Sequence, residues 1–311
     1  MLSSALIKAQ ALGLGFDLVG LTKLGEVESF PHFEEWLNRD YAGDMTYLER
    51  GKEKRRDTTL PFPGAKSAIV VAMNYDGTQP SGPIARYARG GDYHDIMTSK
   101  LDSLREWIES QIGEPVRGKS YVDTGPILER DLARKAGLGW IGKNTNLLNP
   151  QIGSFFFIGS LLVDLELDAD TPFESDHCGT CTRCIEACPT QAITEPRVLD
   201  ATKCISYLTI ESRSEIPDDL RSSVGELLYG CDICQDVCPW NIRFSKELTE
   251  PALAPRTEFT SRNSRDLALE IIEMDDEKFR ERFRASPMKR AKLSGLQRNA
   301  RVVLENAVAD G

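Results

Sequence analysis

All eight cysteines of this 311-residue chain lie between Cys178 and Cys238. Four of them fall within one short stretch, CGTCTRCIEACPT, residues 178–190. Outside the secretory pathway, clustered cysteines are more typical of metal ligands than of disulfides. The N-terminal MLSSALIKAQALGLGFDL lacks the basic start and cleavage site of a secretory signal, and no apolar run has the length of a membrane span. We therefore expect a cytoplasmic protein with a metal centre and no membrane association.

The cysteine spacing indicates which metal centre to expect. Cys178-x2-Cys181-x2-Cys184-x3-Cys188-Pro has the arrangement of bacterial-type ferredoxins, in which the fourth cysteine binds a different cluster from the first three. A second run, Cys231-x2-Cys234-x3-Cys238-Pro, is one cysteine short, and Cys204 lies between the two runs. We predict two [4Fe–4S] clusters with crosswise ligands: Cys178, Cys181, Cys184 and Cys238 for one, and Cys188, Cys204, Cys231 and Cys234 for the other. Zinc is the alternative, but successive two-residue gaps followed by Cys-Pro favour iron–sulfur.

Apolar periodicity and turn residues predict an α+β fold for the chain. Helices are expected over 3–13, 31–39, 95–112 and 126–136, and strands over 16–21, 68–73, 121–122 and 155–167. We expect an N-terminal α/β domain over 1–167, a ferredoxin-like domain over 168–245, and a helical C-terminal segment over 246–311. A ferredoxin needs only a quarter of this length, so the N-terminal domain is expected to hold the electron acceptor.

Charge is distributed unevenly along the chain. The net charge is −10, yet residues 278–301 contain nine basic residues and the single acid Glu281. Taken alone, such a segment is most simply a solvated helical face. The alternative is a surface that contacts phosphates on an otherwise acidic protein. No dinucleotide-binding fingerprint or P-loop accompanies it.

Five stretches resemble the epoxyqueuosine reductase family. They are RYARGGDYH (86–94), YVDTGPILERDLARKAGLGWIGKNTNLLNPQIGSFFFIGSLLVD (121–164), CGTCTRCIEACPTQAI (178–193), KCISYLTIE (203–211) and YGCDICQDVCPWN (229–241). The resemblance implies that epoxyqueuosine at the tRNA wobble position is reduced to queuosine, the last step of its biosynthesis. It also implies a cobalamin beside the two clusters, without a histidine ligand from the protein. VDTGPILER and CISYLTIE distinguish this family from the reductive dehalogenases.

The resemblance also implies roles for individual residues. Asp123 matches the proton donor and a cobalamin contact, and we expect burial to raise its pKa; otherwise it would be a helix cap. Arg55 matches a basic residue near the cofactor and would otherwise be a surface arginine. Ala85 replaces a cysteine found in some relatives. The remaining cobalamin contacts implied are Leu147, Ile158, Ser206, Cys231 and Asp232.

Asp92-x-His94 begins a spacing by which some proteins supply a histidine ligand to cobalamin, but Met97 stands where that motif has glycine. We therefore predict that His94 forms hydrogen bonds at the start of the 95–112 helix.

The basic segment gains weight from the resemblance. The printed sequence ends soon after LQRNARVVLENA, which resembles the opening of a helical extension in longer relatives. We therefore expect the basic segment to carry more of the tRNA binding, through Lys289, Arg290, Lys292 and Arg298. We further expect a monomer that receives electrons from a low-potential donor. The competing hypotheses are a dehalogenase-like enzyme for a small molecule and an electron carrier without its own substrate.

Overall fold

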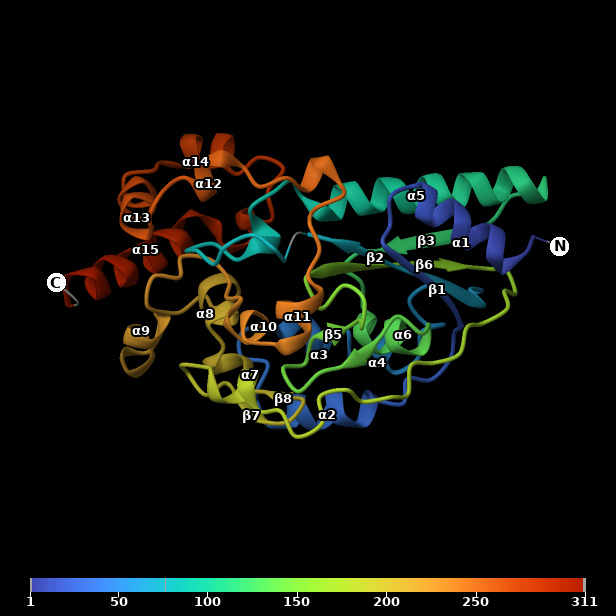
Figure 1. Cartoon of the computed structure of the whole chain (residues 1–311), viewed down its shortest axis with the longest axis horizontal. Coiled ribbons are helices and arrows are strands. Elements are labelled where there is room, and N and C mark those ends of the chain that lie inside the picture. Colours follow the sequence, from blue (N-terminus) through green and yellow to red (C-terminus); the bar gives the residue numbers. More distant parts are fainter. Residues whose placement is uncertain (1, 76, 310–311) are drawn as a thin grey trace.

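The computed structural model describes residues 2–75 and 77–309, and its centre is a four-stranded sheet (Figure 1). The strand order is β1-β2-β6-β3, and every neighbouring pair is antiparallel. Val70 of β2 lies opposite both Gly20 of β1 and Ser160 of β6. The predicted α+β class is confirmed. The strands are β1 (Leu18–Lys23), β2 (Ser67–Asn74), β3 (Gly118–Tyr121) and β6 (Phe156–Val163).

Helices cover both faces of this sheet. α1 and α5 pack on one face, where Ile7, Leu101 and Leu104 are fully buried, and α6 packs on the other (Figure 1). A Cβ on Gly20 would lie 2.0 Å from the carbonyl oxygen of Ala136, so glycine permits the close approach of the chain after α6. The helices of this region are α1 (Ser4–Gly13), α2 (Phe30–Asn38), α3 (Thr46–Arg50), α4 (Lys52–Arg56), α5 (Tyr93–Ile112) and α6 (Glu129–Lys135).

The helix predicted over 126–136 begins later than expected, at Glu129. Residues between the end of β3 and this helix form a turn that contains Asp123, with φ of 59°. The sequence pattern predicted this helix correctly but not the length of the turn before it. The turn is important because it carries the residue expected to act as the proton donor.

The cysteine-bearing segment consists of short helices and small hairpins. Pro239 occupies the first turn of α11, where its missing N–H costs no hydrogen bond. The elements are α7 (Arg183–Glu186), α8 (Ile205–Ile210), α9 (Asp218–Val224), α10 (Ile233–Asp236) and α11 (Pro239–Phe244), with β7 (Ile193–Glu195) pairing β8 (Val198–Leu199). Before this segment, in the N-terminal part of the chain, β4 (Trp140–Ile141) pairs with β5 (Leu147–Leu148).

The C-terminal helices are docked on the cysteine-bearing segment and on the loop before α5. Tyr229 donates a hydrogen bond to the Pro287 carbonyl at 2.8 Å, and the buried Asn299 amide donates to the Thr209 and Leu228 carbonyls. The division into parts at residues 167 and 245 stays a prediction. The tail contains α12 (Thr257–Thr260), α13 (Ser264–Ile272), α14 (Asp276–Arg282) and α15 (Lys292–Ala309), with 3₁₀ turns at Pro251–Leu253 and Pro287–Ala291. Earlier 3₁₀ turns lie at Arg86–Ala88, before α5, and at Ala201–Lys203, before α8.

None of the helices within residues 2–75 and 77–309 combines the length and apolarity needed to span a membrane.

Candidate active site

Four of the cysteines line one cavity of about 140 Å³. Trp240 and Arg183 also line it, and Lys143 reaches across from the β4–β5 hairpin. The Lys143 ammonium donates to the carbonyl oxygens of Gly179 and Cys181, at 2.7 and 3.0 Å. This lysine therefore fixes the first cysteine loop against the N-terminal part of the chain. The four cysteines are Cys178, Cys181, Cys184 and Cys238.

The other four cysteines form a second, more deeply buried group. Burial, together with the neighbouring Cys204, Asp232 and Cys188, raises the pKa of Cys231 to about 12. Burial also raises the pKa of Cys234, with Cys231 and Cys204 as additional causes. Because the neutral thiol is favoured at such positions, a positively charged iron centre is needed to hold these sulfurs as thiolates. The structure thus brings Cys188, Cys204, Cys231 and Cys234 together.

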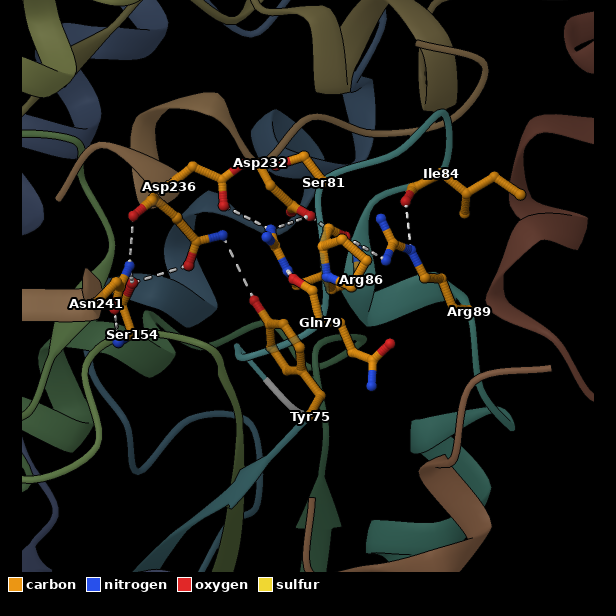
Figure 2. Close-up of polar contacts among 12 residues, drawn as sticks. Tyr75, Gln79, Ser81, Ile84, Arg86, Arg89, Ser154, Asp232, Asp236 and Asn241 are labelled. Atoms are coloured by element: carbon orange, nitrogen blue, oxygen red, sulfur yellow. Dashed lines mark hydrogen bonds and ion pairs between the residues drawn. The ribbon is translucent and has the colours of Figure 1, made fainter. Parts of the chain in front are cut away.

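A buried polar network fastens this second group to the loop before α5 (Figure 2). The Arg86 guanidinium pairs with Asp232 at 3.0 Å and with Asp236 at 2.6 Å, and the Arg86 amide also donates to Asp232. Asp232, predicted as a cobalamin contact, is therefore held by Arg86. In the same network, Asn241 and Ser154 exchange two hydrogen bonds between α11 and the start of β6.

Asp123 lies at a strained position with its carboxylate exposed. Its φ of 59° is uncommon for any residue other than glycine, and strain of this kind is often found at functional sites. The Asp123 amide donates to Glu129 at 2.7 Å, which holds the turn in place. The Asp123 side chain is 66% exposed, and its Oδ2 accepts a hydrogen bond from the Tyr93 hydroxyl at 3.2 Å. Asp123 is therefore no N-cap: Leu128 precedes α6.

The protonation of Asp123 differs from the expectation. Desolvation by the surrounding residues raises its pKa, but the hydrogen bond and charge of His94 and the hydrogen bond from Tyr93 lower the pKa below its ordinary value. Burial and the charge of Asp123 instead raise the pKa of Glu129. The upward pKa shift that was expected for Asp123 is therefore found at Glu129. Asp123 faces the cationic His94, whereas Glu129 is desolvated and faces the anionic Asp123.

His94 joins Asp123 to a buried carboxylate, an arrangement that sequence reasoning did not find. Its Nδ1 lies 2.6 Å from Asp92 Oδ1, and its Nε2 lies 3.5 Å from Asp123 Oδ2. Asp92 also caps α5 by accepting from the His94 amide, as predicted for hydrogen bonding at this helix start. The signal available in the sequence was Asp92 two residues before His94, which indicates a cap but not the distant partner Asp123.

Arg55 is buried rather than on the surface. Burial lowers its pKa, and its Nη1 has no hydrogen-bond partner within the part of the chain that the structure describes. Tyr47 of α3 is close enough to be affected by its charge. Burial raises the pKa of Tyr47, the charge of Asp123 raises it further, and the charges of Arg290 and Arg55 lower it. Arg55, Tyr47, Asp123 and Arg290 therefore share one neighbourhood, although they come from three separate parts of the sequence. A buried, unsatisfied guanidinium is suited to binding an anionic or polar group.

The other predicted cofactor contacts differ in their surroundings. Leu147 is buried in β5, whereas Ile158 of β6 is half-buried and packs against the core on the α6 face. Ser206 is half-buried in the first turn of α8, two residues after Cys204. Of these three, only Ser206 lies close in sequence to a cysteine of the second group.

The four basic residues predicted to contact tRNA do not form one surface. Lys289, Arg290 and Lys292 are exposed at the turn before α15. Arg290 forms two hydrogen bonds with Glu211, and its Cζ lies 5.5 Å from the Tyr47 ring centre. The structure corrects the prediction for Arg298. This residue is only 5% exposed, and its guanidinium donates to the carbonyls of Leu208, Ser212 and Ser214. The prediction for Arg298 failed because a count of basic residues ignores which face of the helix each one occupies.

Two groups of four cysteines are typical of an iron–sulfur redox protein, and comparisons with known proteins agree. Residues 177–241 match the family described as "4Fe-4S double cluster binding domain", which favours iron–sulfur over zinc. Residues 55–124 match the family described as "Epoxyqueuosine reductase QueG, DUF1730".

Relatives match the chain over nearly its full length. The epoxyqueuosine reductase of Cellulophaga algicola is 46% identical over 304 residues, which cover 95% of this chain and 96% of that protein. This chain belongs to the epoxyqueuosine reductase family. An epoxyqueuosine reductase solved with an epoxyqueuosine-modified tRNA-Tyr stem loop is 31% identical, with a TM-score of 0.86 over 97% of this chain and 80% of that one. The Bacillus subtilis enzyme, solved with the loop of its catalytic aspartate swung out of the active site, is 30% identical, with a TM-score of 0.86 over 97% and 81%.

Proposed function

We propose that this protein reduces the epoxide of epoxyqueuosine in the tRNA anticodon, giving queuosine. Family membership over 95% of the chain carries this proposal. The structure supports it, since the charges of Asp123, Arg55 and the exposed Arg290 of the tail all act on Tyr47. The reaction is the last step of queuosine biosynthesis.

We propose that cobalamin binds between Asp123 and the buried cysteine group. Two observations fit this placement: the buried Arg55 Nη1 has no hydrogen-bond partner among residues 2–75 and 77–309, and the Asp123 carboxylate is exposed although polar groups surround it. Arg55, Asp123, Leu147, Ile158, Ser206, Cys231 and Asp232 are the residues proposed to surround the cofactor. Cobalamin supplies a centre of very low reduction potential when bound.

Asp123 is proposed to protonate the oxygen that leaves. Negative charge develops on that oxygen as its bond to carbon weakens, and a positioned carboxylic acid neutralises the charge. His94 and Tyr93 keep the pKa of Asp123 low in the protein alone, so Asp123 is proposed to take up its proton when the bound substrate and cofactor desolvate the site. Asp123 has a positive φ, and Glu129 holds the turn by accepting a hydrogen bond from the Asp123 amide. The swung-out loop of the Bacillus subtilis relative supports a catalytic aspartate on a movable turn in this family.

The tRNA is proposed to lie over the turn before α15. Arg290 and Lys292 are exposed there. Arg290 stacks near the ring of Tyr47, and the charge of Asp123 acts on the same tyrosine. A phosphate at this turn would therefore place an anticodon base close to Asp123. The relative solved with a modified stem loop supports RNA binding by this fold.

The crosswise ligand sets are proposed to form an electron path from the cavity-lining cluster to the buried one. Cys178, Cys181, Cys184 and Cys238 line an open cavity, so electrons are proposed to enter there from a low-potential donor. Arg183 is exposed at this cavity and favours an acidic donor. We further propose that the protein acts as a monomer in the cytoplasm.

Anaerobic turnover tests the proposed reaction. Protein loaded with iron and cobalamin is given a strong reductant and tRNA carrying epoxyqueuosine, and the nucleosides are analysed by mass spectrometry. We expect epoxyqueuosine to lose one oxygen atom. Unchanged epoxyqueuosine in the presence of reduced clusters and bound cobalamin would contradict the proposal.

A further inference from the structure

The segment 231–236, which carries two cysteines of the buried group, also carries two carboxylates. Asp232 lies between Cys231 and Cys234, and Asp236 lies two residues after Cys234. The side chain of Asp232 is 7% exposed and that of Asp236 is 26% exposed. Burial is the main cause of the raised pKa of both cysteines, and the charge of Asp232 is a further cause. The Asp232 carboxylate therefore acts on the place where these sulfurs hold iron.

Negative charge beside an iron–sulfur cluster opposes its reduction. Reduction adds an electron, and a fixed carboxylate repels it more strongly in a buried site than in water. Net charge is one of the factors that set the reduction potential of such clusters. Two carboxylates without a balancing cation on this segment would therefore make the buried cluster hard to reduce.

Arg86 supplies the balancing cation. Its Nη1 lies 3.0 Å from Asp232 Oδ2 and 2.6 Å from Asp236 Oδ1, so a single nitrogen bridges the two carboxylates (Figure 2). The Arg86 side chain is only 5% exposed. A guanidinium stays protonated in proteins, so Arg86 places a permanent positive charge at this buried position.

The surrounding chain holds the Arg86 guanidinium in one orientation. Its Nε donates to the Gln79 carbonyl at 2.6 Å, and its Cζ lies 4.8 Å from the ring centre of Phe155. The Arg86 backbone amide also donates to Asp232 Oδ2 at 2.9 Å. The cation and the carboxylate are therefore fixed relative to each other by both the side chain and the backbone of one residue.

Arg89, the second buried arginine of this loop, makes different contacts. Its guanidinium donates to the carbonyl oxygens of Ile84 and Pro80, each at 2.7 Å (Figure 2). Arg89 therefore ties the loop to itself, whereas Arg86 ties the loop to the two carboxylates of the cysteine-bearing segment.

We propose that Arg86 sets the reduction potential of the buried cluster by offsetting the charges of Asp232 and Asp236. Loss of this cation lowers that potential, so that electrons pass less readily from the cavity-lining cluster to the buried one. Arg86 acts through the two carboxylates and is a positioning residue. The inference rests on the ligand sets and the electron path of the proposed function.

A redox titration followed by EPR spectroscopy tests this role in protein loaded with iron and cobalamin, without tRNA. In Arg86→Met we expect the equilibrium constant for reduction of the buried cluster to fall about tenfold, which is about 59 mV for one electron. The cavity-lining cluster should keep its wild-type potential and serves as the internal reference. A mildly alkaline buffer keeps both carboxylates ionised during the titration.

Two further variants separate charge from structure. Arg86→Lys keeps the charge but not the planar guanidinium, so the buried cluster should stay close to its wild-type potential. Arg86→Met combined with Asp232→Asn removes one charge of each sign. The double variant should recover most of the lost potential although its packing is disturbed further, a non-additive result that damage to the fold would not give.

Several results would overturn the role of Arg86. One is an Arg86→Met protein in which both clusters keep their wild-type potentials. Another is an Arg86→Lys protein with a potential as low as that of Arg86→Met, because the effect would then be structural. If Arg86→Met fails to assemble the buried cluster, Asp232→Asn alone decides: its buried cluster should have a raised potential, and an unchanged one would refute the role. Absence of turnover in the wild type would contradict the proposed function and would leave these potentials unaffected.

Discussion

The two halves of the candidate site are built in different ways. On the cluster half, seven of the eight cysteines come from two short runs, and only Cys204 stands apart. On the acid half, Asp123, His94, Arg55 and Arg290 come from four separate places in the sequence and meet only in the folded chain. The first half is encoded locally and the second by tertiary packing. A cysteine substitution in the first half should therefore abolish turnover by destroying one particular cluster. Substitutions in the second half should lower turnover, stability or tRNA binding by different amounts, depending on the residue.

The largest effect is expected from Cys204→Ala. Loss of this thiolate should destroy the buried cluster and abolish turnover, because the electron path is cut. Cys188→Ala should damage the same cluster, whereas Cys238→Ala should damage the one that contains Cys178. EPR spectroscopy that resolves the two clusters checks this. If Cys188→Ala and Cys184→Ala damaged the same cluster and Cys204→Ala left that cluster intact, the crosswise assignment would be refuted.

On the acid half, Asp123→Asn should lower turnover by about 10²–10⁴-fold. Asparagine keeps the size of the side chain and can hydrogen bond to Tyr93 and His94, but it cannot donate the proton. Both clusters, bound cobalamin and tRNA affinity should be retained. Turnover close to the wild-type rate would show that another group protonates the oxygen.

Arg298→Met should affect stability rather than RNA binding. The substitution leaves the Leu208, Ser212 and Ser214 carbonyls without their buried donor, so unfolding should become easier by about 2–4 kcal/mol. Thermal or chemical denaturation measures this, with Arg301→Met, an exposed arginine of the same helix, as the control. Unchanged stability with weakened tRNA binding would restore Arg298 as an RNA contact.

The smallest effect is expected from reversing charge at the exposed turn. Arg290→Glu with Lys292→Glu should weaken tRNA binding and reduce the steepness of its salt dependence by about 0.7–0.9 for each phosphate that the protein no longer neutralises. Lys289 is left intact because it pairs with Asp92. Binding of cobalamin should not change. Wild-type affinity and wild-type salt dependence together would make this turn a solvated surface.

These contrasts explain what the sequence could predict. The helix over 95–112 and the apolar strand over 68–73 depend on local periodicity, and the structure has them at Tyr93–Ile112 and Ser67–Asn74. The strand predicted over 155–167 ends earlier, at Val163, and the one predicted over 121–122 lies at Gly118–Tyr121. The packing of α15 against α8 is not local, so the burial of Arg298 could not be predicted from its charge. Likewise, the cation that lowers the pKa of Asp123 comes from residue 94, and only the fold brings the two together.

The central claim is that the two halves act on one substrate, with electrons from the clusters and a proton from Asp123. Its most direct test is a single turnover followed by rapid-freeze EPR. Both clusters are first reduced, the reductant is removed, and tRNA carrying epoxyqueuosine is added. We expect the wild type to reoxidise its clusters at the rate at which queuosine forms, and Asp123→Asn to keep them reduced. Reoxidation of the variant at the wild-type rate, or of the wild type without loss of the epoxide oxygen, would contradict the account.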